Sequence, residues 1–264
     1  MALSRRGFLK GLSLAAVSAT PAFAQRSFWG QPLPDEPVDF IFGYGSLINT
    51  PSREGTGRPG IPTLPARLSP DFGHVRSWCA RSRSGFTALG LRPRAAGEEG
   101  GSINGVVFPV DAGLLPRFDR REGNYNRVPV SAEHIETVSW QRLPERGTIW
   151  VYVPKSLSDP SATPLLPDAE HPIVQSYVDL VLQGALEYGG TFASELIATT
   201  ADWGRYWLND REYARRPWMA IKEAGRIDEL LAITPPAAAS FPNRLYSEAY
   251  SARHMRPVLE GAPR

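Results

Sequence analysis

The sequence predicts an α+β protein, in which a small mixed, curved sheet or barrel is flanked by helices and followed by a C-terminal helical extension. Two observations lead to this fold class. Strand-like apolar runs fill the chain up to about residue 154, and helical periodicity dominates the part that follows. Strands and helices that are segregated along a chain favour an α+β fold over an alternating α/β fold.

The strand predictions rest on segments rich in Val, Ile, Phe, Tyr and Trp that are bounded by glycine or proline. These segments are residues 38–43, 73–81, 86–92, 102–110, 127–138 and 147–153. Between the first two, residues 50–65 are expected to form a long loop. Residues 111–121 predict a short helix, because Leu114, Leu115 and Phe118 fall on one side of it.

Helical spacing of apolar residues begins after a linker rich in Ser, Pro and Asp. It runs from Ile173 to Tyr188 and stops at Gly189-Gly190. A second short helix is expected around residues 192–198, and a third begins near Pro217. The aromatic residues of this part favour core packing over a binding platform, although they could also cover one mouth of a barrel or bury a dimer face. They are Trp203, Tyr206, Trp207, Tyr213 and Trp218.

The N-terminus has the form of a twin-arginine export signal. Ser4-Arg5-Arg6-Gly7-Phe8-Leu9-Lys10 precedes an apolar stretch, and Ala22-Phe23-Ala24 supplies small residues for signal peptidase. The apolar stretch is shorter than the roughly 20 residues that span a bilayer. We therefore expect passage through the twin-arginine translocase, cleavage after Ala24 and a periplasmic location, with an uncleaved anchor as the alternative.

The expected organisation follows from these segments. It comprises a signal peptide over residues 1–24, a linker over 25–37, a core over 38–155, a linker and helical extension over 156–233, and an irregular tail over 234–264.

Charge and cysteine content restrict the class of function. Removal of the signal leaves 26 basic and 27 acidic residues. With these nearly equal numbers, no basic stripe remains that would indicate a nucleic-acid partner. The single cysteine, Cys79, lies in a strand-like run and is interpreted as a buried structural thiol rather than a nucleophile. The four histidines fall in four different segments without metal-ligand spacing, so no metal is expected.

The end of the first expected strand is the most informative part of the core. Phe40-Ile41-Phe42 runs into Gly43-Tyr44-Gly45-Ser46-Leu47, a loop with two glycines around one tyrosine. Glycine lets a ligand approach the main chain closely, so the loop N–H groups could converge on an anion or a carbonyl oxygen. Ile48 occupies the third-glycine position of a dinucleotide fingerprint, which excludes that motif. A plain strand end with a tight turn is the alternative.

A second informative segment is Asp119-Arg120-Arg121-Glu122-Gly123-Asn124-Tyr125, between the short helix and the next strand. A glutamate at a helix end, followed by glycine, can turn its side chain inward. The alternative is a solvated charge cluster, which is the usual fate of such a run. Arg120 and Arg121 are expected to lie at the solvated surface, although they could steer anionic substrates.

Together, these two segments resemble the gamma-glutamylcyclotransferase superfamily, including its ChaC-type and bacterial branches. The resemblance rests on Tyr44-Gly45-Ser46-Leu47 after the first strand, on Glu122 in an Arg-Glu-Gly context, and on Tyr125 shortly afterwards. The later helix that contains Ser176-Tyr177 and Gly184-Ala185 is similar to a helix of ChaC-type members. The similarity covers roughly residues 38–190, and residues 191–264 have no clear counterpart.

The resemblance implies cyclisation of a γ-glutamyl group to 5-oxoproline with release of an amine, amino acid or peptide, without metal or cofactor. It assigns Glu122 as the proton carrier and Gly45, Ser46 and Leu47 as backbone donors to a small γ-glutamyl substrate. Tyr44 and Tyr125 would line the pocket, and Asp119 is the second choice of base. A non-catalytic periplasmic binding module on the same fold is the alternative function.

Overall fold

A computed structural model of the chain describes residues 38–159, 161–213 and 221–255. The signal peptide and linker expected over residues 1–24 and 25–37 lie outside this part. Among the described residues, no helix has the length and apolar character needed to cross a bilayer.

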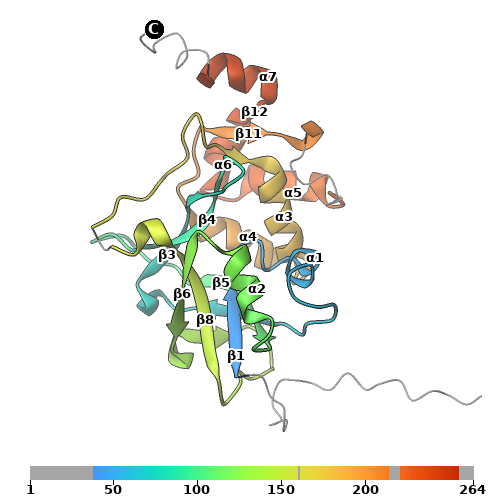
Figure 1. Cartoon of the computed structure of the whole chain (residues 1–264). Coiled ribbons are helices and arrows are strands. Elements are labelled where there is room, and N and C mark those ends of the chain that lie inside the picture. The colour runs from blue at the N-terminus through green and yellow to red at the C-terminus, as the bar shows by residue number, and fades with distance from the viewer. Residues whose placement is uncertain (1–37, 160, 214–220, 256–264) are drawn as a thin grey trace, which may run out of the picture.

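A mixed six-stranded sheet forms one end of the molecule (Figure 1). Strand β1 lies inside it, antiparallel to β5 and parallel to β8, and Phe42 of β1 pairs with Val107 of β5. The sheet starts at β6 and ends at β7, so it is curved but not closed into a barrel. Across the sheet, the strands are β6 (Tyr125–Val130), β8 (Thr148–Pro154), β1 (Asp39–Gly43), β5 (Ile103–Val110), β2 (Leu64–Leu68) and β7 (Ile135–Thr137).

Two three-stranded sheets complete the β-structure. A hairpin of long strands forms most of the first, whose members are β10 (Thr200–Ala201), β3 (His74–Arg81) and β4 (Thr87–Pro93). The second is made of short parallel strands, β12 (Leu245–Tyr246), β11 (Trp207–Asn209) and β9 (Ile173–Val174).

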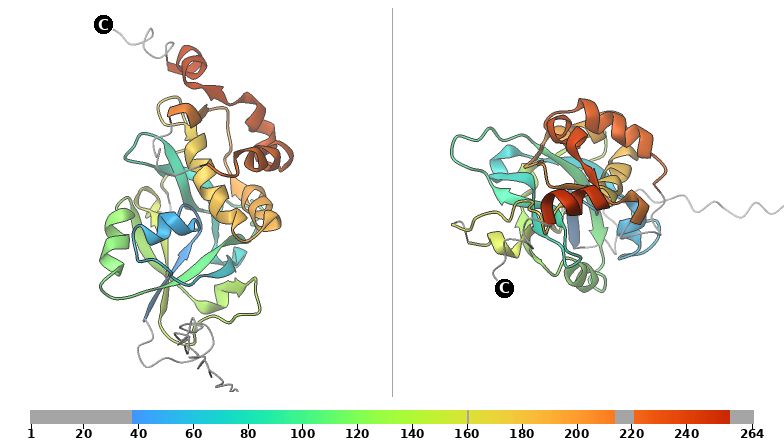
Figure 2. Two further views of the ribbon diagram at one scale, coloured as in Figure 1. Left: turned by 90° about the vertical axis from the view of Figure 1, so that its right-hand side faces the viewer. Right: turned by 90° about the horizontal axis from the view of Figure 1, so that it is seen from above.

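Helices lie against both ends of this framework. The longer helices and the short parallel sheet lie together at the end opposite the six-stranded sheet (Figures 1 and 2). The helices are α1 (Thr50–Glu54), α2 (Leu115–Arg121), α3 (Gln175–Leu186), α4 (Gly190–Ala198), α5 (Ala224–Ile233), α6 (Ala237–Ser240) and α7 (Ser247–Tyr250). This architecture confirms the predicted fold class, with an open sheet in place of a barrel.

The structure differs from the sequence-based elements in several places, of which three involve the longest segments. Residues 50–65 contain α1 and the start of β2 rather than one long loop. The strand expected over 127–138 is two strands, because the chain turns at Ser131, so that β6 pairs with β8 and β7 pairs with β2. Residues 234–255, expected to be irregular, form α6, β12, α7 and a π-helical turn over Ser251–Met255.

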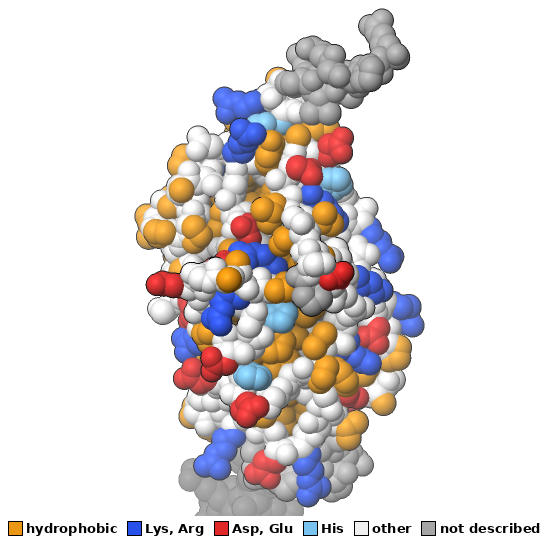
Figure 3. All heavy atoms as spheres, turned by 90° about the vertical axis from the view of Figure 1, so that its left-hand side faces the viewer, with side chains coloured by type: hydrophobic (Ala, Val, Ile, Leu, Met, Phe, Trp, Pro, Cys, Tyr) orange, Lys and Arg blue, Asp and Glu red, His pale blue; other side chains and the backbone are white. Residues whose placement is uncertain are grey.

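One continuous apolar core joins the two ends of the molecule. Trp203 stacks between Trp78 and Trp207, with ring centroids 5.0 and 4.9 Å away, which confirms that these aromatic residues pack in the core. Tyr206 instead contacts His254 at 5.1 Å, and Trp218 lies outside the described residues. On the face shown in Figure 3, acidic and basic side chains are interspersed.

Candidate active site

The loop that follows β1 forms one wall of the site. Its chain turns sharply, since the N–H of Ile48 donates to the carbonyl of Gly45 at 2.9 Å. Within the described part of the chain, the backbone N–H groups of Gly45, Ser46 and Leu47 donate to no acceptor. Three neighbouring donors that remain unused by the fold are suited to bind an anion or a developing oxyanion.

Two buried arginines hold this loop from behind. Arg53 is 1% exposed, and its guanidinium donates to the carbonyls of Leu47 at 3.0 Å and Ile48 at 2.9 Å. Arg76 is fully buried and donates to the carbonyl of Tyr44 at 3.4 Å. Burial disfavours the charged form and lowers the pKa of Arg76 to about 9. The carbonyls of Tyr44, Leu47 and Ile48 are thus held by buried side chains in the interior.

Glu122 forms the opposing wall at the end of α2. Phe118 packs the helix against the core. It is fully buried and contacts Phe108, with 5.5 Å between ring centroids. Pro116 suits the first turn, where its missing N–H costs nothing. The N–H of Glu122 caps the helix by donating to the carbonyl of Phe118 at 2.8 Å. The helix end therefore fixes where the Glu122 side chain begins.

Arg121 connects the two walls. Its Nε lies 3.0 Å from Oε1 of Glu122, and the two side chains are 18% and 15% exposed. Its Nη2 donates to the hydroxyl of Ser46 at 2.9 Å, and its Nη1 donates to the carbonyl of Ser52 at 2.6 Å. The prediction that Arg121 is a solvated surface residue is wrong, because α1 and the loop supply acceptors that bury its guanidinium.

All six residues predicted for the site line one cavity, which we call the main cavity. It is open to solvent, and the space between the loop and the end of α2, including that at its mouth, measures about 320 Å³. The predicted residues on its wall are Tyr44, Gly45, Ser46, Leu47, Glu122 and Tyr125. Phe42, Gly43, Leu89, Tyr152 and Tyr177 complete the lining. The structure thus brings Glu122 and the loop together across some 75 residues of sequence, while their chemical roles stay predictions.

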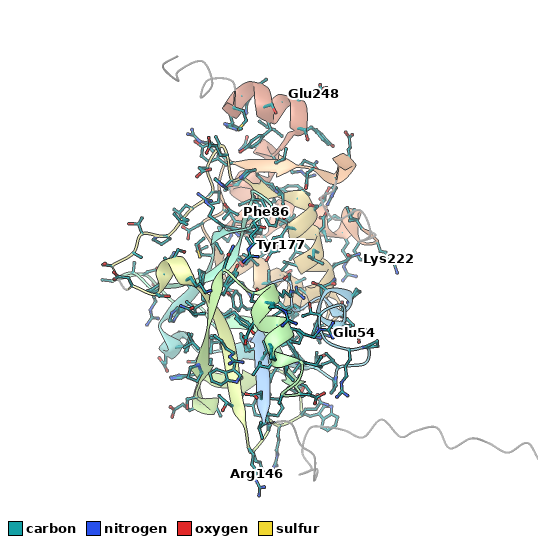
Figure 4. The ribbon with its side chains drawn as sticks, viewed as in Figure 1. Glu54, Phe86, Arg146, Tyr177, Lys222 and Glu248 are labelled. Atoms are coloured by element: carbon teal, nitrogen blue, oxygen red, sulfur yellow. The ribbon has the colours of Figure 1, made fainter. Side chains whose placement is uncertain are left out.

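The tyrosines of the main cavity act as walls. Tyr44 donates its hydroxyl to the carbonyl of Tyr152 at 2.6 Å, and Tyr125 donates to the carbonyl of Leu89 at 2.9 Å. Burial raises the pKa of both hydroxyls well above their usual value, so they stay neutral. Tyr177, on α3, packs against Phe86 with 5.2 Å between ring centroids (Figure 4).

The partner of Ser46 differs from the one that a nucleophile needs, and the partner of Asp119 differs from the one that a base needs. A nucleophilic serine requires a base that accepts its proton, whereas the Ser46 hydroxyl receives a hydrogen bond from Arg121. Asp119 is 42% exposed, accepts a hydrogen bond from the Tyr152 hydroxyl at 2.8 Å, and does not line the main cavity. Of the two acids near the end of α2, only Glu122 lines the cavity.

Sequence reasoning missed the residues that support the site from outside the two motifs. Arg53, Arg76, Tyr152 and Tyr177 come from α1, β3, β8 and α3. Their sequence signals are weak, because a single arginine or tyrosine in an apolar run looks like any half-buried residue. Cys79 is buried, and burial raises the pKa of its thiol to about 12, as expected for a structural thiol. In the described ranges, no group of three His, Cys, Asp or Glu is placed to hold a metal ion.

No protein-family model matches the chain, and no curated protein matches it. Solved structures show distant similarity. One is a gamma-glutamyl cyclotransferase, at 17% identity and a TM-score of 0.42 over 61% of this chain and 86% of that chain. Another, from Homo sapiens, is an uncharacterized protein, at 18% identity and a TM-score of 0.42 over 62% and 90%. A third, from yeast, is a gamma-glutamyl cyclotransferase specific to glutathione, at 13% identity and a TM-score of 0.33 over 77% and 96%.

Proposed function

We propose that this chain cyclises a γ-glutamyl group to 5-oxoproline and releases the amine, amino acid or peptide that was attached to it. One observation carries the proposal. Glu122 lines the same cavity as Gly45, Ser46 and Leu47, whose backbone N–H groups donate to no acceptor among the described residues. The geometry of this site and the motifs that form it, rather than the distant structural similarities, support the proposal.

The reaction needs few groups because it is intramolecular. The α-nitrogen of the substrate attacks its own γ-carbonyl carbon, so a C–N bond of the lactam forms and the γ-amide C–N bond breaks. Holding the α-nitrogen and the γ-carbonyl carbon together in one molecule can give an effective molarity of about 10⁵–10⁸ M. The protein therefore has to fold the glutamyl chain back, stabilise the negative charge on the carbonyl oxygen, and move one proton.

Glu122 is the proton carrier in this scheme. Its carboxylate accepts the proton that the α-amine loses on attack and delivers it to the departing nitrogen, so no proton is gained or lost overall. The pairing with Arg121 at 3.0 Å holds the carboxylate at the end of α2, and Glu122 lines the main cavity. The N–H groups of residues 45–47 would receive the oxyanion or the substrate α-carboxylate.

The twin-arginine signal expected over residues 1–24 would place this activity in the periplasm. That part of the proposal rests on the sequence alone.

The test measures 5-oxoproline released from γ-glutamyl dipeptides, γ-glutamyl amines and glutathione. Glu122→Gln keeps the size of the side chain but cannot carry the proton, so kcat/KM should fall by about 10²–10⁴. The matched control is Glu133→Gln, since Glu133 is exposed and lies outside both motifs. This variant should retain the rate of the parent protein.

Two results would overturn the proposal. Full activity in Glu122→Gln would remove the assigned proton carrier. Release of no 5-oxoproline from any compound, together with saturable binding of one of them, would favour the non-catalytic binding module.

A further inference from the structure

A second cavity opens beside the main cavity and shares part of its wall. The shared residues are Ser46, Glu122, Tyr125 and Tyr177. The second cavity is also open to solvent and, with the space at its mouth, measures about 620 Å³. Its remaining wall comes from the β3–β4 hairpin and from the end of α2 with the segment that follows. Those residues are Arg81, Ser82, Arg83, Phe86, Ala88, Arg121, Gly123 and Asn124. A molecule whose reacting group lies at Glu122 in the main cavity can therefore continue into the second.

Three arginines line the second cavity, and two of them already have carboxylate partners. Arg81 pairs with Asp168 at 2.6 Å, and Arg121 pairs with Glu122 at 3.0 Å. Arg83 is exposed and has no carboxylate or hydrogen-bond acceptor among the described residues. The positive charge that the fold leaves unneutralised in this cavity is therefore that of Arg83.

The guanidinium of Arg83 lies next to Gly123, the residue that follows Glu122. A Cβ atom at position 123 would lie 2.9 Å from Nη2 of Arg83 and 3.6 Å from its Cζ. The guanidinium thus lies over the backbone of the residue that directly follows Glu122. The side-chain amide of Asn124 donates to the carbonyl of Arg81 at 3.0 Å, which ties this segment to the β3–β4 turn.

We propose that the second cavity is the leaving-group subsite and that Arg83 selects leaving groups with a carboxylate next to the departing nitrogen, namely amino acids rather than simple amines. This inference rests on the proposed function of Glu122. The departing nitrogen has to meet Glu122 to receive its proton. In an amino-acid leaving group, one carbon atom separates that nitrogen from the carboxyl group. The carboxylate is thereby carried from Glu122 toward the guanidinium over Gly123.

The chemistry of the wall agrees with such an occupant. An arginine fork matches a carboxylate with two parallel hydrogen bonds, and Arg83 has no competing acceptor within the described residues. Phe86 and Tyr177 supply an apolar surface where the two cavities join, suited to a small side chain on the leaving group. A free amine offers nothing for Arg83 to bind and gains only the apolar contact.

The test compares two substrates that differ in one group, γ-glutamyl-alanine and γ-glutamyl-alaninamide, by 5-oxoproline release. The parent protein should prefer the acid by on the order of tenfold in kcat/KM, since one charge-assisted pair is at stake. Arg83→Gln should remove that preference by lowering the rate with the acid and leaving the rate with the amide nearly unchanged. Arg94→Gln is the matched control, because Arg94 is also exposed and follows the opposite end of β4.

The outcomes separate this inference from the function on which it rests. An equal loss with both substrates in Arg83→Gln would mean that Arg83 binds the glutamyl part, which overturns the inference and leaves the cyclisation intact. An unchanged preference in Arg83→Gln, or a parent protein that prefers the amide, also overturns it. Release of no 5-oxoproline from either substrate would overturn the proposed function itself.

Discussion

The two walls of the main cavity are attached to the protein in different ways. The loop wall, residues 43–47, is backed by Arg53 and Arg76, which are 1% and 0% exposed and donate to its carbonyls. The Glu122 wall is the half-buried end of the seven-residue helix α2. Its link to the loop is Arg121, a side chain that remains 18% exposed.

This difference suits the two tasks that the proposed cyclisation would assign to these walls. Donors to an oxyanion work by being fixed in place before the charge develops, which a buried and fully bonded support provides. A proton carrier has to serve two nitrogen atoms in succession, so a carboxylate at a helix end, held by one arginine, has the necessary freedom. Disturbing the loop wall should therefore cost mainly stability, and disturbing the Glu122 wall should cost mainly rate.

The largest effect on stability is expected from Arg76→Met. Besides the loop, Arg76 donates to the carbonyl of Asn104 at 2.7 Å and to that of Leu196 at 3.0 Å, all in the buried core. Each buried acceptor left without a donor costs about 1–3 kcal/mol, and relief from burying a charge offsets part of the sum. We expect the free energy of unfolding in urea to fall by about 3–5 kcal/mol.

Arg67→Met is the control for that measurement. Arg67 is 30% exposed and pairs with Glu195 of α4, the helix that also provides Leu196. A partly exposed pair is worth about 1 kcal/mol or less. If both variants lost the same small amount, the buried arginine would not be the firmer support, and the contrast between the walls would fail.

A second effect on the loop wall should appear at alkaline pH. The pKa of Tyr44 is raised, chiefly by burial and then by Cys79 and Glu122, so the folded protein keeps a proton that the unfolded chain loses above about pH 10. Unfolding then releases this proton, and the free energy of unfolding falls as pH rises. The contribution is complete below the unfolded pKa and declines by about 1.4 kcal/mol per pH unit above it.

Tyr44→Phe isolates this contribution. Urea unfolding at about pH 8 and about pH 11 should show a smaller decline in this variant than in the parent protein. Its stability at the lower pH should also drop by about 1 kcal/mol, because the bond to the Tyr152 carbonyl is lost. Tyr246→Phe serves as control, since Tyr246 is 58% exposed. Equal declines in Tyr44→Phe and the parent protein would show that Tyr44 ionises in the folded state.

The sequence was sufficient for the fold class and for both motifs because these depend on local patterns. The apolar run before Gly43 and the helical spacing from Ile173 gave β1 and α3 to within a few residues. It missed β2, in which Pro65 removes a backbone donor and Arg67 interrupts the apolar pattern. It also predicted one strand over 127–138, since a change of pairing partner at Ser131 leaves no local trace.

The residues that support the site could not be predicted from the sequence, for a related reason. Arg121 looks like one charge in an acidic and basic run, and its burial depends on acceptors 69 and 75 residues away, at Ser52 and Ser46. Arg76 likewise lies in an apolar strand, and its partners come from β5 and α4. Site residues that lie next to one another in a motif could be predicted from the sequence. Contacts between segments that lie far apart in the sequence could not.

The smallest effect on stability, and the sharpest test of the contrast, is expected from Arg121→Lys. Lysine keeps the charge but has a single nitrogen, which cannot serve Ser46, Ser52 and Glu122 together as the planar guanidinium does. The free energy of unfolding should fall by only about 1 kcal/mol, since the group is at the cavity edge. The kcat for 5-oxoproline release should fall by about tenfold with little change in KM, because the carboxylate loses the arginine that keeps it within reach of both nitrogen atoms, while the loop donors remain. Arg120→Lys, at an exposed neighbour on the same helix, should change neither quantity. A loss of stability as large as that of Arg76→Met, with kcat unchanged, would place Arg121 among the supports of the loop and remove the distinction between a fixed wall and a working one.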